Sequence, residues 1–396
     1  MTPLTLDAEP ACPASTPPAE QATSDDALRI EPRAIRDIPR DRWDALAART
    51  PWATPFSSWA FQRAWWDAYG DNAHEETLVL CPDRPGGGDP IAIVPLMHRH
   101  EVEPSDALTH TKIRHGADMT LTPVPPTATA IFFGASYHAD YATTLAAPED
   151  LPRVTEALAG FFATRVGLEP WDVIDLRRLR CGDPAADALA TAIGRREIAE
   201  GWTLNVERED VCPVVTLAPG TDMETYLGSL PKKIRHEVRR KVRRAEAVGE
   251  IRLETSADPL ADLEVFIDLH QKRWGLDGLF PNTPGGDQSR LFARRMFELN
   301  GADGPLKLTF LWVGERRIAS GIHVETPDGY LFYNAGFDPD ARDLSPGVVM
   351  VYAYLRQALE LGLTRFDFLR GDEPYKYEWG AVDEPIQRLL VRRRDG

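Results

Sequence analysis

The chain has 396 residues, a hydrophobic content of 43% and a formal charge of −16 at neutral pH. Such a length suits roughly two to three domains, and the charge disfavours general binding to nucleic acid or anionic membranes. The sequence has no apolar run of about 18 residues for a membrane span. Residues 1–27 also lack the basic start and apolar centre of a signal peptide. Together these features predict a cytoplasmic protein.

The four cysteines and the short motifs exclude several kinds of chemistry. Cys12, Cys81, Cys181 and Cys212 lie far apart and form no CxxC pair, which favours a reduced compartment over disulfides or a zinc site. No HExxH, GxxxxGK[ST], GxSxG or GxGxxG pattern is present. We therefore expect no metal, no nucleotide-binding loop and no serine-hydrolase site.

The first half begins with a segment that is rich in Pro, Ala, Ser and Thr. Residues 1–27 contain almost no large apolar side chains and are expected to form a disordered tail. Periodicity and turn signals after it predict helices at 43–47, 57–70, 149–167 and 184–197. Strands are predicted at 77–83, 90–97, 130–135 and 171–179, the first two joined as a hairpin by a glycine-rich turn.

The second half repeats this order of elements. Strands are predicted at 250–255, 306–313, 317–325, 330–338, 364–370 and 385–393, and helices at 259–274, 288–300 and 345–362. Short pieces also correspond, since "WDVIDLRRLRCGD" occupies the place that "TRFDFLRGDEP" has later. The repeat predicts two similar α/β domains, 28–205 and 206–396.

A basic helix is predicted at 231–247, at the entry to the second half. Between Lys232 and Arg244 there are eight Lys or Arg and one Glu, a local charge of +7 that leaves −23 for the rest of the chain. One face carries an apolar stripe for packing, made of Ile234, Val238, Val242 and Ala245. Several like charges stand four residues apart, which destabilises an isolated helix.

Negatively charged groups should therefore lie against this helix. The protein's own carboxylates are one source, and the phosphates of a ligand such as coenzyme A or tRNA are the other. For the second case the candidate phosphate-binding residues are Lys232, Arg235 and Arg239.

The stretch "DLSPGVVMVYAYLRQALELG" begins with features of an anion-binding helix start. Ser345 is a candidate N-cap, Pro346 suits the first helical position and Gly347 would allow a ligand to approach the backbone closely. Free N–H groups and the helix dipole favour an anion there. An ordinary capped helix fits the same residues, whereas the position directly after a predicted strand favours the anion site.

The stretch "DFLRGDEPYKYEWG" is dense in polar and aromatic residues. A carboxylate and a phenol from it could supply the proton acceptor and donor that amine acylation needs. A loop fixed by internal ion pairs and stacking fits equally well. The residues concerned are Asp367, Arg370, Asp372, Glu373, Tyr375 and Lys376. Further upstream, His270, Arg273 and Trp274 share one helix face, as either substrate contacts or structural residues.

Several stretches resemble the GNAT superfamily of acyltransferases, and within it the CelD/BcsL-like branch that is related to FemAB and carries a BioF2-like acetyltransferase domain. They are "TPFSSWAFQRAWWDAYG", "YHADYATTLAAP", "WDVIDLRRL", "LPKKIRHEVRRKVRRAE", "LHQKRW" and the long "YNAGFDPDARDLSPGVVMVYAYLRQALELGLTRFDFLRGDEPYKYEWGA". The resemblance runs from about residue 30 to the end.

The resemblance implies an α/β fold of tandem GNAT-like domains, each a mixed, mostly antiparallel sheet flanked by helices. It also implies an acyl-CoA donor, most simply acetyl-CoA, without a metal. The acceptor would be an amine or hydroxyl of a small molecule or glycan precursor, with a link to envelope or polysaccharide metabolism. Two alternatives remain open: a FemAB-like transferase that takes its donor from aminoacyl-tRNA, and a non-catalytic scaffold.

GNAT folds hold the thioester in a notch between two splayed strands, with the pyrophosphate at the next helix start. By resemblance, Tyr333, Asn334 and Ala335 line this notch and 344–348 face the phosphates. Here the usual Q/RxxGxG/A signature is reduced to "RDLSPG", with Arg342, Ser345 and Gly347 as partial substitutes. The full set expected to bind the donor is Tyr333, Asn334, Ala335, Arg342, Leu344, Ser345, Pro346, Gly347 and Val348.

For the chemistry itself we expect three residues. Asp367 or Asp372 is the base that takes the proton of the acceptor, and Tyr375 protonates the leaving thiolate. The residues expected to contact substrate or phosphate are Lys232, Arg235, Arg239, His270, Arg273, Trp274, Arg370 and Lys376.

Overall fold

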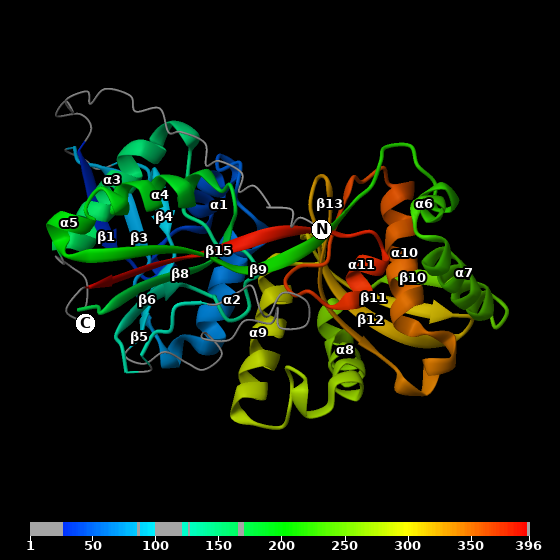
Figure 1. Cartoon of the computed structure of the whole chain (residues 1–396). Coiled ribbons are helices and arrows are strands. Elements are labelled where there is room, and N and C mark those ends of the chain that lie inside the picture. The colour runs from blue at the N-terminus through cyan, green and yellow to red at the C-terminus, as the bar shows by residue number, and fades with distance from the viewer. Residues whose placement is uncertain (1–26, 85–87, 100–120, 126, 165–169, 394–396) are drawn as a thin grey trace, which may run out of the picture.

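A computed structural model describes residues 27–84, 88–99, 121–125, 127–164 and 170–393 (Figure 1). Apart from residue 27, the predicted disordered tail lies outside the described residues. Within these ranges no helix has the length and apolar character to cross a membrane.

Most strands of the described chain belong to one continuous sheet of eleven strands. Its order is β10-β11-β12-β13-β14-β9-β15-β8-β6-β5-β2, and a smaller sheet has the order β1-β3-β4-β7. Most neighbours are antiparallel, with parallel pairs at β13–β14 and β6–β8. The strands are β1 Leu28–Pro32, β2 His74–Glu75, β3 Leu78–Pro82, β4 Ala92–Val94, β5 Leu96–Arg99, β6 Ala130–Phe133, β7 Leu145–Ala146, β8 Val173–Arg180, β9 Trp202–Thr216, β10 Ile251–Thr255, β11 Leu306–Val313, β12 Arg316–Glu325, β13 Gly329–Phe337, β14 Arg365–Asp367 and β15 Val382–Arg393.

Helices flank the large sheet in both halves (Figure 1). They are α1 Arg40–Ala48, α2 Trp59–Tyr69, α3 Leu151–Thr164, α4 Pro184–Gly194, α5 Glu197–Glu200, α6 Met223–Ser229, α7 Lys232–Glu246, α8 Pro259–Trp274, α9 Pro284–Asn300, α10 Pro346–Glu360 and α11 Pro374–Glu378. The predicted α/β class, with mostly antiparallel sheets flanked by helices, is confirmed.

The two halves exchange their last strands at the centre of the sheet. In the first half β8 lies parallel to β6, and in the second half β14 lies parallel to β13. The strand that follows β8 in the chain, β9, pairs with β14, while the strand that follows β14, β15, pairs with β8. β9 and β15 also pair with each other from Trp202 to Val214, so the sheet is continuous across both halves (Figure 1).

The predicted strand 90–97 is divided in the structure. The segment 90–97 forms a hairpin partner for β3 as expected, but Pro95 lies between β4 and β5, and β5 joins the large sheet instead of the small one. Proline has no N–H for a sheet ladder, which explains the break.

β9 has no counterpart among the predicted strands, because Glu207–Asp210 interrupts its apolar alternation with four charged residues. The expected domain boundary between residues 205 and 206 falls inside this strand.

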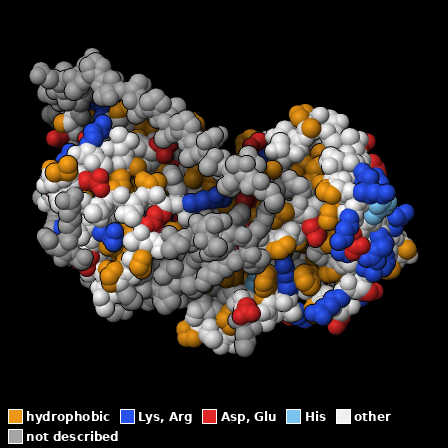
Figure 2. Space-filling model, in the orientation of Figure 1, with side chains coloured by type: hydrophobic (Ala, Val, Ile, Leu, Met, Phe, Trp, Pro, Cys, Tyr) orange, Lys and Arg blue, Asp and Glu red, His pale blue; other side chains and the backbone are white. Residues whose placement is uncertain are grey.

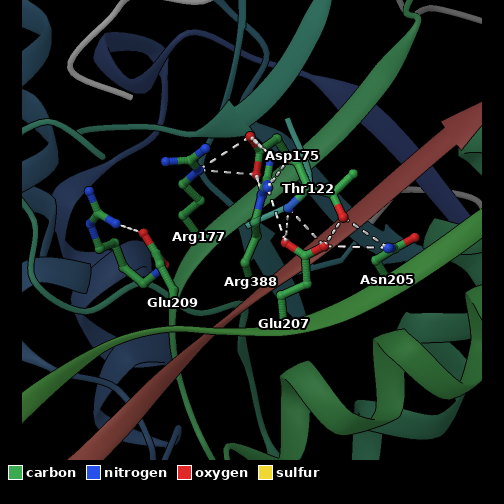
Figure 3. Close-up of polar contacts among 8 residues, drawn as sticks. Thr122, Asp175, Arg177, Asn205, Glu207, Glu209 and Arg388 are labelled. Atoms are coloured by element: carbon green, nitrogen blue, oxygen red, sulfur yellow. Dashed lines mark hydrogen bonds and ion pairs between the residues drawn. The ribbon is translucent and has the colours of Figure 1, made fainter. Parts of the chain in front are cut away.

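Buried ion pairs join the exchanged strands (Figure 3). The fully buried guanidinium of Arg388 on β15 donates to both carboxylate oxygens of Asp175 on β8, at 2.6 and 2.7 Å. It also reaches Glu207 on β9 at 3.2 Å. Arg177 donates to Asp175 at 3.2 Å, and Arg178 pairs with Glu209. One arginine therefore ties together three strands that come from both halves.

Removing one partner of this cluster should destabilise the whole fold. We expect Arg388→Met to lower the free energy of unfolding by about 3–5 kcal/mol, because Asp175 would stay buried without its bidentate partner. Urea unfolding followed by circular dichroism measures this.

The matched control is Arg49→Met, which removes an exposed pair with Glu149 at 3.1 Å and should cost no more than about 1 kcal/mol. Equal effects of the two variants would contradict the role of Arg388 as a link between the halves.

Candidate active site

β13 and β14 run together for three residues and then separate. Gly329–Leu331 pairs in parallel with Arg365–Asp367. β13 continues to Phe337 against β12, while β14 ends at Asp367 and the chain turns away through Leu369, which has φ +57°. The edge of β13 from Phe332 to Phe337 is thus left open on the β14 side, which creates a notch in the sheet.

A mostly apolar cavity of about 150 Å³ occupies this notch. β13 supplies Ala335 to it, the start of α10 supplies Gly347 and Val348, and α11 supplies Tyr375. The further lining residues are Arg273, Ala319, Phe332, Gly336, Phe337, Met350, Val351, Glu378 and Trp379. Its mostly apolar lining suits an unbranched chain.

Close packing of α8 against β13 shapes one wall of the notch. A Cβ on Gly336 would lie 2.3 Å from the backbone nitrogen of His270, so only glycine lets the two elements approach this closely. From α8, Arg273 and Trp274 donate to the Ala335 carbonyl at 3.2 and 3.4 Å.

The start of α10 opens into a second cavity of about 300 Å³ beside the notch. Ser345, at φ +54°, stands at the N-cap without a side-chain capping bond, and Pro346 takes the first turn. A Cβ on Gly347 would meet no atom within 4 Å. Lys272, Arg273 and Arg342 line the same cavity. Three cations and a helix N-terminus make this cavity suitable for a phosphate.

The basic helix α7 packs beside α10, and its stripe of Val238, Val242 and Ala245 is buried. Arg244 donates to the Ser345 hydroxyl at 2.7 Å, so the end of α7 reaches the rim of the phosphate cavity. The residues expected to bind phosphate, Lys232, Arg235 and Arg239, line neither cavity.

The protein supplies part of the negative charge that α7 needs. Arg239 pairs with Glu224, while Arg240 and Lys241 share Glu237. The remaining cations have no carboxylate within 4 Å among the described residues. They are Lys232, Lys233, Arg235, Arg243 and Arg244. Figure 2 shows the resulting gathering of Lys and Arg side chains over α7.

The loop after β14 is held from inside by Lys376. This side chain is 3% exposed, and its ammonium donates to the carbonyls of Leu369, Arg370 and Gly371 at 2.9–3.0 Å. It also pairs with Glu373 at 2.9 Å. Lys376 was expected to contact a ligand, but its buried ammonium has only protein oxygens around it and fixes the loop instead.

The three candidate catalytic residues lie in different environments. The phenol of Tyr375 borders the notch, and desolvation, aided by Glu373, raises its pKa above the ordinary value. The phenol of Tyr375 is therefore protonated at neutral pH. Asp372 is fully buried and lines none of the cavities described.

Asp367 borders a larger cleft of about 640 Å³ between the halves. Burial raises the pKa of its carboxylate, and Arg365 opposes this effect. Its oxygens accept from Tyr141 at 2.8 Å, Arg365 at 3.0 Å and the Leu369 amide at 2.8 Å. Tyr141 lines the same cleft, together with Phe56 and Tyr333.

Several other expected residues lie away from the notch. The side-chain oxygen of Asn334 accepts a hydrogen bond from the Ala335 amide at 2.8 Å. Arg370 forms an ion pair with Asp140 at 3.2 Å. His270 is buried against Phe266 and Phe280, where desolvation lowers its pKa to about 4. Leu344 is buried in the core between α7 and α10.

Sequence reasoning missed Glu378, Lys272 and Tyr141. Glu378 follows Tyr375 by three residues in the same polar stretch, and this spacing places both on one face of α11. The spacing could therefore have indicated that Glu378 also lines the notch. Lys272 lies within the "LHQKRW" motif. Tyr141 comes from the first half, and nothing local connects it to Asp367.

Comparison with known proteins agrees with this geometry. Residues 232–377 match the family model for an acetyltransferase (GNAT) domain. The fold is similar to that of FemX, with TM-score 0.51 and 11% identity over 88% of this chain and 96% of that one. It is also similar to a conserved protein of unknown function from Bacteroides thetaiotaomicron, with TM-score 0.52 and 10% identity over 93% and 100%. A search of curated proteins finds no match.

β13 and the open start of α10 both lie in the segment that matches the GNAT acetyltransferase domain. The chain therefore contains a segment that resembles a GNAT acetyltransferase domain, and its overall fold is similar to that of FemX. Within the described residues, no group of three or more His, Cys, Asp or Glu side chains is placed to hold a metal.

Lys376→Met should loosen the loop that carries Tyr375. Three carbonyls and Glu373 would lose their donor, and we expect the free energy of unfolding to fall by about 1–3 kcal/mol or more. Urea unfolding measures the change.

Lys307→Met is the control, because the Lys307 ammonium donates to one surface carbonyl, that of Ala302, at 3.2 Å. If Lys376→Met were no more destabilising than Lys307→Met, the loop would not depend on the buried ammonium.

Proposed function

We propose that the protein transfers an acyl group from acyl-CoA, most simply acetyl-CoA, to an amine or hydroxyl acceptor. The observation that carries this proposal is the separation of β13 from β14 next to the open start of α10. The pantetheine chain and thioester would lie in the 150 Å³ notch, and the phosphates in the 300 Å³ cavity with Lys272, Arg273 and Arg342.

The acceptor would enter from the 640 Å³ cleft, which is lined by Asp367 and Tyr141. Its nitrogen or oxygen attacks the thioester carbon, a C–N or C–O bond forms and the C–S bond breaks. The proton of the acceptor passes to the Tyr141 oxygen while the Tyr141 hydroxyl proton moves to Asp367, 2.8 Å away. The raised pKa of Asp367 improves it as a base near neutral pH.

Tyr375 would protonate the leaving thiolate. Its phenol borders the notch and remains neutral because of desolvation. The residue as a whole is 38% exposed, so solvent can return the proton after each turnover. We assign no proton transfer to Asp372, since its side chain is fully buried away from the cavities.

Aminoacyl-tRNA is the alternative donor that the FemAB resemblance implies. The notch supports acyl-CoA over it, because its mostly apolar lining suits an unbranched pantetheine chain better than a polar nucleoside ester.

Binding of the donor can be tested without knowledge of the acceptor. Acetyl-CoA at about 100 times its Kd should raise the free energy of unfolding by about 2.7 kcal/mol, seen as a rise in Tm. Gly347→Asp should abolish this rise, because open space around Gly347 admits the side chain and its carboxylate would repel the phosphates.

Gly285→Asp is the matched control. Gly285 also follows an N1 proline at a helix start, that of α9, and also has no atom within 4 Å of its Cβ position. An acid near either helix start is favourable for the helix itself. Loss of the acetyl-CoA effect in both variants, or in neither, would contradict the assigned phosphate site.

Tyr375→Phe should lower kcat by about 10²-fold and leave KM for the donor nearly unchanged, since it removes a proton transfer and not a binding contact. Thiol release from acetyl-CoA measures this, with a panel of amine and hydroxyl acceptors.

Tyr377→Phe serves as the control on the same helix, because the Tyr377 hydroxyl donates to Asp383 at 2.6 Å and lines none of the cavities. Full activity of Tyr375→Phe would exclude Tyr375 as the leaving-group acid.

A further inference from the structure

The outer face of α7 carries a continuous stripe of positive charge. At 100° per residue, its exposed basic residues fall within an arc of about 120°. They are Lys232, Lys233, His236, Arg240, Arg243 and Arg244. The buried stripe of Val238, Val242 and Ala245 points the opposite way, so the basic face does not pack against the core.

Most of this charge is not neutralised by the protein. In the stripe, only Arg240 pairs with a carboxylate within the described part of the chain, that of Glu237. A helix of 15 residues is about 22 Å long, so the stripe matches one helix or one short edge of a partner. Bound CoA would leave most of it unused, because among the six residues only Arg244 reaches the rim of the phosphate cavity.

The charge of the rest of the chain restricts the partner further. With +7 on this segment and −16 overall, the remaining surface repels an acidic partner. An acidic protein would therefore be steered to α7, the helix whose end touches the start of α10. Its docking site would lie next to the entrance for the donor.

We infer that α7 is the docking surface for an acidic carrier protein that presents the acyl group on a phosphopantetheine arm. This inference rests on the proposed function, because the arm has the same thioester, pantetheine chain and first phosphate as acyl-CoA. The arm would place its phosphate at the start of α10 and its thioester in the notch. Transfer then breaks the C–S bond to the carrier's arm, and Tyr375 protonates the thiolate that remains on the carrier.

The test compares two donors against two charge-reversed variants. An acyl carrier protein of fatty-acid synthesis, loaded with an acetyl group, and acetyl-CoA are each titrated into the full chain by calorimetry. The α7 variant is Lys233→Glu with Arg243→Glu, which breaks no ion pair with a described residue. The control is Arg49→Glu with Arg195→Glu, an equal change of charge at exposed positions in the first half.

We expect the α7 variant to weaken binding of the loaded carrier at least about tenfold and the control to leave it within about twofold. Binding of acetyl-CoA should stay unchanged in both variants. Carrier binding to the unmodified protein should also weaken with added salt.

Three other results contradict the inference. They differ in whether they also contradict the proposed function. The inference fails and the proposed function stands if acetyl-CoA binds while the carrier fails to bind. The same holds if the carrier binds equally well to the α7 variant and to the control. If neither donor binds, the proposed function fails as well. If the unmodified chain retains RNA that the α7 variant loses, while the carrier does not bind, the face belongs to a nucleic acid instead.

Discussion

The pairing of β9 with β15 is the interaction on which the rest of the structure depends. Each strand closes the sheet of the half to which it does not belong in sequence, and the pair runs from Trp202 to Val214. The chain cannot separate its halves without breaking this ladder and the buried contact of Arg388 with Asp175. This ladder joins the two halves that line the 640 Å³ cleft, an arrangement that favours a site which must hold two substrates in register.

The same constraint explains why the notch stays open. β9 takes the free side of β14, so the three-residue strand is held between two neighbours although it is too short to follow β13 further. Beyond Asp367 the chain turns, and Lys376 fixes the turn by binding three carbonyls. The gap between β13 and β14 is thus maintained by specific contacts. The hydrogen bonds of Lys376 hold the loop after β14, and the close approach of Gly336 to α8 holds β13.

The basic helix shows how far a charge pattern can be interpreted. The protein's own carboxylates supply part of the negative charge that the sequence called for, since Glu224 and Glu237 neutralise three cations. Arg244 stands at the proposed phosphate site. The residues first expected to bind phosphate point elsewhere on the helix. Spacing along the helix separates the packed face from the charged one, but the identity of the cation nearest the cavity depends on how α7 crosses α10.

The sequence by itself determined the class of fold, most helices and strands, the apolar stripe of α7 and the proline-led start of α10, because these depend on periodicity and turn chemistry within a few residues. It could not reveal β9, whose charged middle is tolerated only because partners such as Arg178 and Arg388 meet Glu209 and Glu207. Tertiary structure alone decided the exchange of the last strands, the contact of Tyr141 with Asp367 across 226 positions and the internal role of Lys376. These are long-range pairings of polar groups, and burial rather than local pattern selects them.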